Sequence, residues 1–73
     1  MGHYLKLLGR VVSELRHEKG WSQEQLAAAA DLHRTYVGGI ERGERNLTVR
    51  NLLRLAAALE VKPTQLLDRV DAS

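Results

Sequence analysis

The chain has 73 residues, with 11 lysines and arginines against 9 aspartates and glutamates, and it contains no cysteine. This length accommodates one small domain, which we take to be residues 1–73, and excludes an enzyme whose site lies between two lobes. The lack of cysteine excludes a disulfide scaffold, a thiol nucleophile and cysteine-bound metal sites. The stability of the fold must therefore come from a compact apolar core.

The N-terminal ten residues contain only a short apolar stretch, which Arg10 interrupts, and this is not the pattern of a secretory signal. No segment approaches the roughly 18 consecutive apolar residues that a membrane span needs. We therefore expect a cytoplasmic protein without a membrane partner.

The first predicted helix covers residues 4–19. Its apolar residues recur at steps of three and four, which is the spacing of an amphipathic helix. They are Leu5, Leu8, Val12 and Leu15. The charged residues between them, Arg16 included, are expected on a solvated face, and Gly20 is a natural left-handed end to the helix.

The second predicted helix begins at Ser22, an N-cap residue that forms a capping box with Gln25. At this start, one apolar residue precedes the N-cap and a second lies in the first turn of the helix. The same spacing between two apolar residues recurs at three later positions in the chain. The predicted starts of the remaining helices are His33, Thr48 and Lys62, and their predicted ends are Gly43, Glu60 and Val70. Residues 71–73 are expected to fray. The sequence thus predicts an all-α fold of five helices.

A turn of about three residues, 31–33, separates the second and third predicted helices. Such a turn is typical of the helix-turn-helix motif, in which the second helix enters the major groove of DNA. The motif would span about residues 22–42. A generic helical bundle with a tight turn explains the same pattern equally well.

The distribution of arginine favours DNA. The chain has eight arginines and three lysines, and five of the arginines fall between residues 33 and 54, where only two glutamates oppose them. The planar guanidinium donates paired hydrogen bonds to phosphate and to guanine. The alternative is a solvated charged surface with intrahelical pairs such as Glu41–Arg45.

The start of the third predicted helix holds the candidate base contacts, because residues at the N-terminus of a recognition helix reach base edges. Arg34 suits guanine, Thr35 a base or a phosphate, and Tyr36 a phosphate or sugar. Gly39, beside the helix-weakening Gly38, would bring the backbone close to a base. The alternatives are a partly buried core tyrosine and glycines that are merely tolerated or that pack against a neighbouring helix.

The candidate contacts to the DNA backbone are polar and basic residues around the motif. They are Gln23, His33, Arg42, Arg45, Asn46 and Arg50. His33 and Thr48 are also expected to cap helices.

No residue pattern indicates catalysis. The three histidines are scattered without a metal-binding spacing, the serines have no evident His/Asp partner, and no glycine-rich loop follows a strand. We expect no enzymatic activity, cofactor, metal or small-molecule ligand.

The C-terminal part carries more apolar residues than one short helix needs, so we expect it to form a dimer surface. The residues concerned are Leu59, Val61, Leu66, Leu67 and Val70. The alternative is that they complete the core of the monomer.

Residues 5–68 resemble the lambda-repressor/Cro-type (Xre-type) helix-turn-helix domains, on the segments SQEQLA, RTYVGGIERGERN and LLRLAAAL. The resemblance implies a five-helix domain that binds a palindromic DNA operator as a homodimer, without catalysis. Two residues depart from the family pattern: Asp31 replaces the usual turn glycine, and His33 replaces the usual Asp or Ser cap.

The segment RTYVGGIERGERNLT also looks like the controller proteins of restriction–modification systems. These are small dimeric regulators of their own gene and of the endonuclease gene. The likeness implies that residues 34–36 read DNA, that Arg45 and Asn46 contact it from a loop, and that Gln23 contacts a phosphate. A stand-alone phage or chromosomal repressor and an antitoxin-like interaction module of the same fold are the alternatives.

Overall fold

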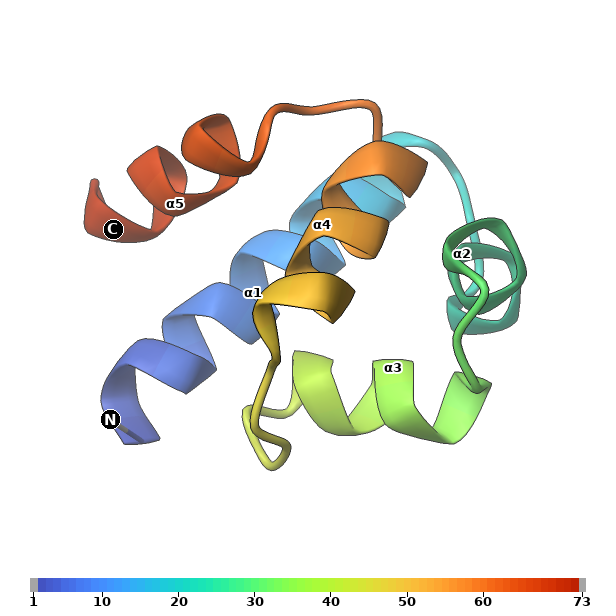
Figure 1. Cartoon of the computed structure of the whole chain (residues 1–73), viewed down its shortest axis with the longest axis horizontal. Helices are drawn as coiled ribbons and strands as arrows, with labels where there is room; N and C mark the ends of the chain where they lie inside the picture. Colours follow the sequence, from blue (N-terminus) through green and yellow to red (C-terminus); the bar gives the residue numbers. More distant parts are fainter. Residues whose placement is uncertain (1, 73) are drawn as a thin grey trace.

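The computed structural model describes residues 2–72, which form five helices and no strand. The helices are α1 (Gly2–Glu18), α2 (Gln23–Ala30), α3 (Arg34–Glu41), α4 (Val49–Ala58) and α5 (Pro63–Asp71). Figure 1 shows α1 running behind α4, with α2 and α5 at opposite ends of the molecule. The predicted all-α, five-helix fold is confirmed.

The helix starts agree with the predicted caps. Ser22 and Gln25 form the capping box at α2. The Nδ1 atom of His33 accepts the N–H of Thr35 at 3.1 Å, and the Thr48 hydroxyl accepts the N–H of Asn51 at 3.1 Å. Side-chain acceptors thus satisfy N–H groups that a helix start leaves unpaired.

The ends of α1, α3, α4 and α5 differ from the predictions by one or two residues. α3 ends at Glu41 and α4 at Ala58 because the chain turns left-handed soon after each, at Gly43 (φ 74°) and Glu60 (φ 60°). α5 extends to Asp71, so the predicted fraying does not include this residue, and Ser73 lies outside the described residues. Asp31 adopts φ 58° in the helix-turn-helix turn, which Asp tolerates better than most residues.

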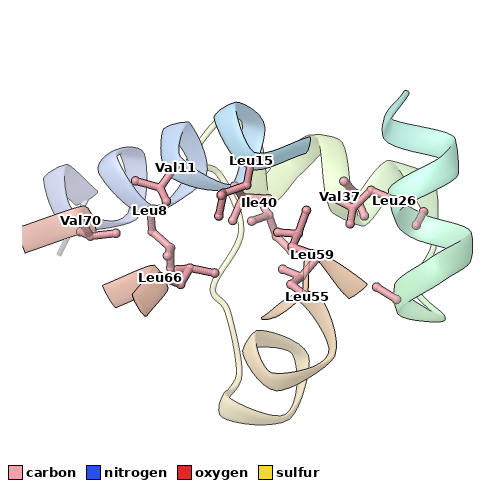
Figure 2. Packing of buried hydrophobic residues seen from close by; sticks show 13 residues of the cluster. Leu8, Val11, Leu15, Leu26, Val37, Ile40, Leu55, Leu59, Leu66 and Val70 are labelled. Atoms are coloured by element: carbon pink, nitrogen blue, oxygen red, sulfur yellow. The ribbon is translucent and has the colours of Figure 1, made fainter. Parts of the chain in front are cut away.

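The core takes side chains from all five helices, and in Figure 2 it runs from Val70 and Leu8 at one end to Val37 and Leu26 at the other. α1 packs on α3 and α5, and α2 packs on α3 and α4. The core therefore fixes α2 and α3 relative to each other.

The core also corrects the predicted dimer surface. Leu59, Leu66 and Val70 are 3%, 0% and 1% exposed within the single chain. Leu66 and Val70 complete the core where α5 packs on α1, and Leu59 joins the same core from the end of α4. Their side chains are therefore not available to a partner. Of the predicted set, only Val61 and Leu67 remain partly exposed.

None of the helices within residues 2–72 is both long and apolar enough to cross a membrane.

Gly9 allows α1 to cross α3 closely. A Cβ atom at this position would lie 2.7 Å from the carbonyl oxygen of Glu41 and closer still to that of Ile40. Backbone atoms of a packed helix cannot give way as a flexible side chain can, so any side chain here forces the two helices apart.

Gly9→Ala is expected to lower the free energy of unfolding by about 2 kcal/mol, because overpacking outweighs the gain in helix propensity. Urea denaturation followed by circular dichroism measures the change. Gly38→Ala is the matched control, since its Cβ would meet only the ends of the Arg42 and Gln23 side chains. Equal stability changes in the two variants would contradict the argument.

Candidate nucleic-acid interface

A polar groove opens between the N-terminus of α2 and the exposed side of α3. Its lining combines three guanidinium groups, two hydroxyls and a carboxamide with a single carboxylate. The lining residues are Arg16, Ser22, Gln23, Glu24, Arg34, Thr35, Gly38 and Arg42. The groove thus brings together candidate contacts that the sequence placed on two separate helices.

A buried ion pair forms the floor of this region. Arg16 and Glu41 make two hydrogen bonds, of 2.7 Å from Nε and 3.0 Å from Nη2, and their side chains are only 10% and 6% exposed. The third guanidinium nitrogen, Nη1, donates to the carbonyl of Trp21 at 2.7 Å. The pair therefore ties α1 to α3 and to the segment that leads into α2.

The sequence interpretation of Arg16 as a solvated residue is wrong. Glu41 pairs with Arg16 rather than with Arg45, so the intrahelical alternative does not occur for this glutamate. A signal was present: Arg16 follows Val12 by four residues and Gly9 by seven, which puts it on the stripe of α1 that packs against α3.

The environment of Glu41 favours its ionised form. Burial alone would raise the pKa of this carboxyl group. Hydrogen bonds from Arg16 and Gln23, together with the positive charge of Arg16, outweigh the burial, and the pKa of Glu41 lies below its usual value. The carboxylate therefore stays charged beneath the groove.

Gln23 is positioned by this carboxylate. Its Nε2 atom donates to Oε1 of Glu41 at 3.0 Å. A primary amide carries two N–H donors, so the second remains for a phosphate at the N-terminus of α2, where backbone N–H groups and the helix dipole also favour an anion. The absence of a side chain at Gly38 leaves room beside Gln23.

Arg34 and Thr35 are both exposed at the first turn of α3. Arg34 lies 3.4 Å from Glu24, but both side chains are mostly in water. Such a surface pair contributes little and breaks easily. The structure thus leaves these two candidate base contacts free to meet a ligand.

Tyr36 is half-buried, and its hydroxyl is engaged within the chain. The hydroxyl donates to the carbonyl of Asn46 at 3.0 Å and accepts from Nδ2 of Asn51 at 3.1 Å. This agrees with the alternative of a partly buried tyrosine, in which Tyr36 ties α3 to the following loop and to α4.

His33 caps α3 and also presents a hydrogen-bond donor to the solvent. Because Nδ1 accepts a backbone N–H, the proton of the neutral ring is on Nε2. Since the residue is exposed, Nε2 can donate to a phosphate without loss of the cap.

The other predicted backbone contacts lie at and after the end of α3. Arg42, Arg45, Asn46 and Arg50 are all exposed, and Arg42 forms a surface pair with Glu44 at 2.9 Å. Gly39 is different, because it is buried beneath the side chain of Arg45. A side chain of the protein thus fills the space that the missing Cβ leaves, and the contact of the Gly39 backbone with a base stays a prediction.

Among residues 2–72, no three or more His, Cys, Asp or Glu side chains are grouped so that they could hold a metal ion.

The model of the helix-turn-helix family HTH_3 matches residues 12–66 of this chain. The chain belongs to this family. Control protein C.BamHI of Bacillus amyloliquefaciens is 48% identical over 63 residues, which are 85% of this chain and 78% of that protein.

Two solved structures extend the similarity. The restriction–modification controller protein C.AhdI from Aeromonas hydrophila has a TM-score of 0.83 and 50% identity, over 85% of this chain and 94% of its own. The tetramer of the controller protein C.Esp1396I in complex with its natural 35 base-pair operator has a TM-score of 0.87 and 38% identity, over 94% and 91%. The resemblance to controller proteins is confirmed.

Proposed function

We propose that this protein is a restriction–modification controller: a DNA-binding transcription regulator that recognises a palindromic operator as a homodimer and regulates its own gene and the endonuclease gene. The observation that carries the proposal is the groove between α2 and α3, in a chain about half identical to known controller proteins. The protein acts by binding alone, in the cytoplasm where its operator lies, without catalysis, cofactor or small-molecule ligand.

In this proposal α3 enters the major groove and α2 lies across its mouth. Arg34 and Thr35 face the base edges because they are the exposed residues of the first turn of α3. Gln23 and His33 donate to phosphates beside them. The two copies of α3 in a dimer would lie about 34–36 Å apart, one turn of DNA.

The remaining basic residues supply affinity. Arg42, Arg45 and Arg50 lie in water at the end of α3 and after it, with Asn46 between them. When these side chains neutralise DNA phosphates, the phosphates release their counterions. The affinity for DNA is therefore expected to fall steeply as the salt concentration rises.

We further propose that the dimer forms through α4. Val49 and Leu53 are 72% and 49% exposed, and they are the only large aliphatic side chains exposed among residues 3–72. They lie one turn apart, and Ala57 extends their stripe by another exposed position. In a two-fold symmetric dimer, this apolar stripe is covered by the same stripe of a second copy of the chain. The stripe begins three residues after Asn46, so it lies beside the loop proposed to contact DNA.

Selection of bound duplexes from a random DNA pool tests the main proposal. Enrichment of an inverted repeat with half-sites about one turn apart is the expected result. A repeat found only beside phage or other chromosomal genes would favour the stand-alone repressor. No enrichment, together with a tight protein partner in a pull-down, would replace the proposal with the interaction module.

Arg34→Ala is expected to weaken binding to the selected operator by about 5- to 150-fold, equivalent to roughly 1–3 kcal/mol. The preference at one base pair of each half-site should relax, because the guanidinium no longer contacts a base. Fluorescence anisotropy on the operator and on single-base variants measures both effects. Arg69→Ala, which removes the same charge from α5 away from the groove, is the control. Unchanged affinity in Arg34→Ala would rule out this assignment.

A further inference from the structure

Arg45 lies across α3 at Gly39. A Cβ atom built on Gly39 would be 2.5 Å from Cγ of Arg45, 3.4 Å from Cδ and 3.2 Å from Nε. Contacts below 3.0 Å are not tolerated, and Cγ is close to the backbone of Arg45 rather than at the mobile end of its side chain. Any residue other than glycine at position 39 must therefore displace the side chain of Arg45 from Cγ outwards.

The loop around Arg45 is held on both sides. The N–H of Glu44 donates to the carbonyl of Gly39 at 2.9 Å, and the hydroxyl of Tyr36 donates to the carbonyl of Asn46 at 3.0 Å. The residues before and after Arg45 are thus both fastened to α3. A side chain at position 39 would therefore displace the side chain of Arg45 and leave the path of the loop unchanged.

Gly39 follows Thr35 by four residues, so the two lie on the same side of α3, one turn apart. The stem of Arg45 covers the α3 backbone at Gly39, and its Nε lies 3.2 Å from a Cβ atom built there, so the side chain crosses α3 one turn after Thr35. A long, flexible side chain that is already packed in place loses less freedom when it binds a ligand.

We propose that Gly39 is a positioning residue for DNA binding: it forms the seat that holds the side chain of Arg45 against the DNA-facing side of α3. The proposal rests on the proposed function and adds to it, because it gives the helix-weakening glycine a role that acts through another residue rather than through direct contact. Alanine favours helix more than glycine does, so the variant that removes the seat is expected to fold.

A double-mutant cycle tests this. Gly39→Ala and Arg45→Ala are made singly and together, and affinity is measured by anisotropy on the operator selected with the unmodified protein. Each single variant is expected to lose about tenfold in affinity, with a shallower salt dependence because one basic contact is lost. Gly39→Ala should cause no further loss, within about twofold, when Arg45 is already alanine.

The outcomes separate the two proposals. Equal losses from Gly39→Ala with arginine and with alanine at position 45 would overturn the positioning role, because a purely structural defect acts in both. Unchanged affinity in either single variant would overturn it too, while operator binding by the unmodified protein still supports the proposed function. Failure of the unmodified protein to select any DNA would overturn both. Without DNA, the ¹⁵Nε resonance of Arg45 should shift in Gly39→Ala, and an unchanged resonance would contradict the seat itself.

Discussion

Replacing Glu41 by alanine is expected to lower the free energy of unfolding by about 3–5 kcal/mol. The change removes the partner of Arg16, whose side chain is only 10% exposed, and leaves a buried positive charge without compensation. It also removes the acceptor of the Gln23 amide. Small domains have total stabilities near the lower end of roughly 5–15 kcal/mol, so this variant should be close to unfolding at room temperature. Urea denaturation followed by circular dichroism measures the loss.

Two further variants test whether the loss of stability in Glu41→Ala comes from the buried charge. Glu44→Ala removes a carboxylate from the exposed Arg42–Glu44 pair and should change the stability by less than about 0.5 kcal/mol. The double replacement Arg16→Met with Glu41→Leu should recover most of the loss, because it leaves no buried charge. If the double replacement is as unstable as Glu41→Ala, the buried-charge explanation is wrong.

The Arg16–Glu41 pair makes the stability of the fold depend on pH in the acidic range. Because the pKa of Glu41 lies below the ordinary 4.5, its ionisation stabilises the folded chain fully above that value. The contribution is lost as the pH falls below 4.5 and through the folded pKa. The melting temperature of the unmodified protein should therefore fall in this range, and Glu41→Gln, which starts lower, should fall less.

Leu53→Asp is expected to weaken the homodimer by at least about tenfold. Fully burying an exposed leucine side chain contributes about 1.5–3 kcal/mol. Leu53 is already half-buried, so the dimer gains about half of this from each copy, and a two-fold contact loses about 1.5–3 kcal/mol together. The carboxylates would also be placed close to their symmetry mates. Sedimentation equilibrium gives the dimer dissociation constant. Leu53 is 49% exposed in the single chain, so its own fold should tolerate the change.

Leu67→Asp is the matched control, because Leu67 lies on α5 and is one of the two predicted dimer residues that remain partly exposed. It should leave the dimer intact. Dissociation by Leu67→Asp but not by Leu53→Asp would return the dimer surface to α5.

Most of the fold could be predicted from local signals in the sequence. Ser22, Gln25 and Thr48 cap helices as their spacing indicated, because a capping bond joins residues only three apart. The left-handed turn at Asp31 agrees with the family resemblance, which has a glycine at this position. The ends of α3 and α4 were less predictable, since helix ends vary by one or two residues with the geometry of the last turn.

Long-range contacts limited the prediction of the site. Arg16 and Glu41 are 25 residues apart, and nothing local to either one indicates that the other neutralises it. The burial of Leu59 and Leu66 likewise depends on how α4 and α5 meet the other helices, which periodicity does not encode. Arg45 reaches Gly39 only because the loop folds back on α3.

The groove unites two kinds of residue with different freedom to change in evolution. Arg34 and Thr35 lie in water and hold nothing else in place, so the chain can exchange them and keep its fold. Gln23 shares a carboxylate with Arg16, so a change there disturbs the interior as well as the surface. In the proposed function, a new sequence preference therefore needs substitution at only these two positions, while a change in the residues that present them also lowers the stability of the fold.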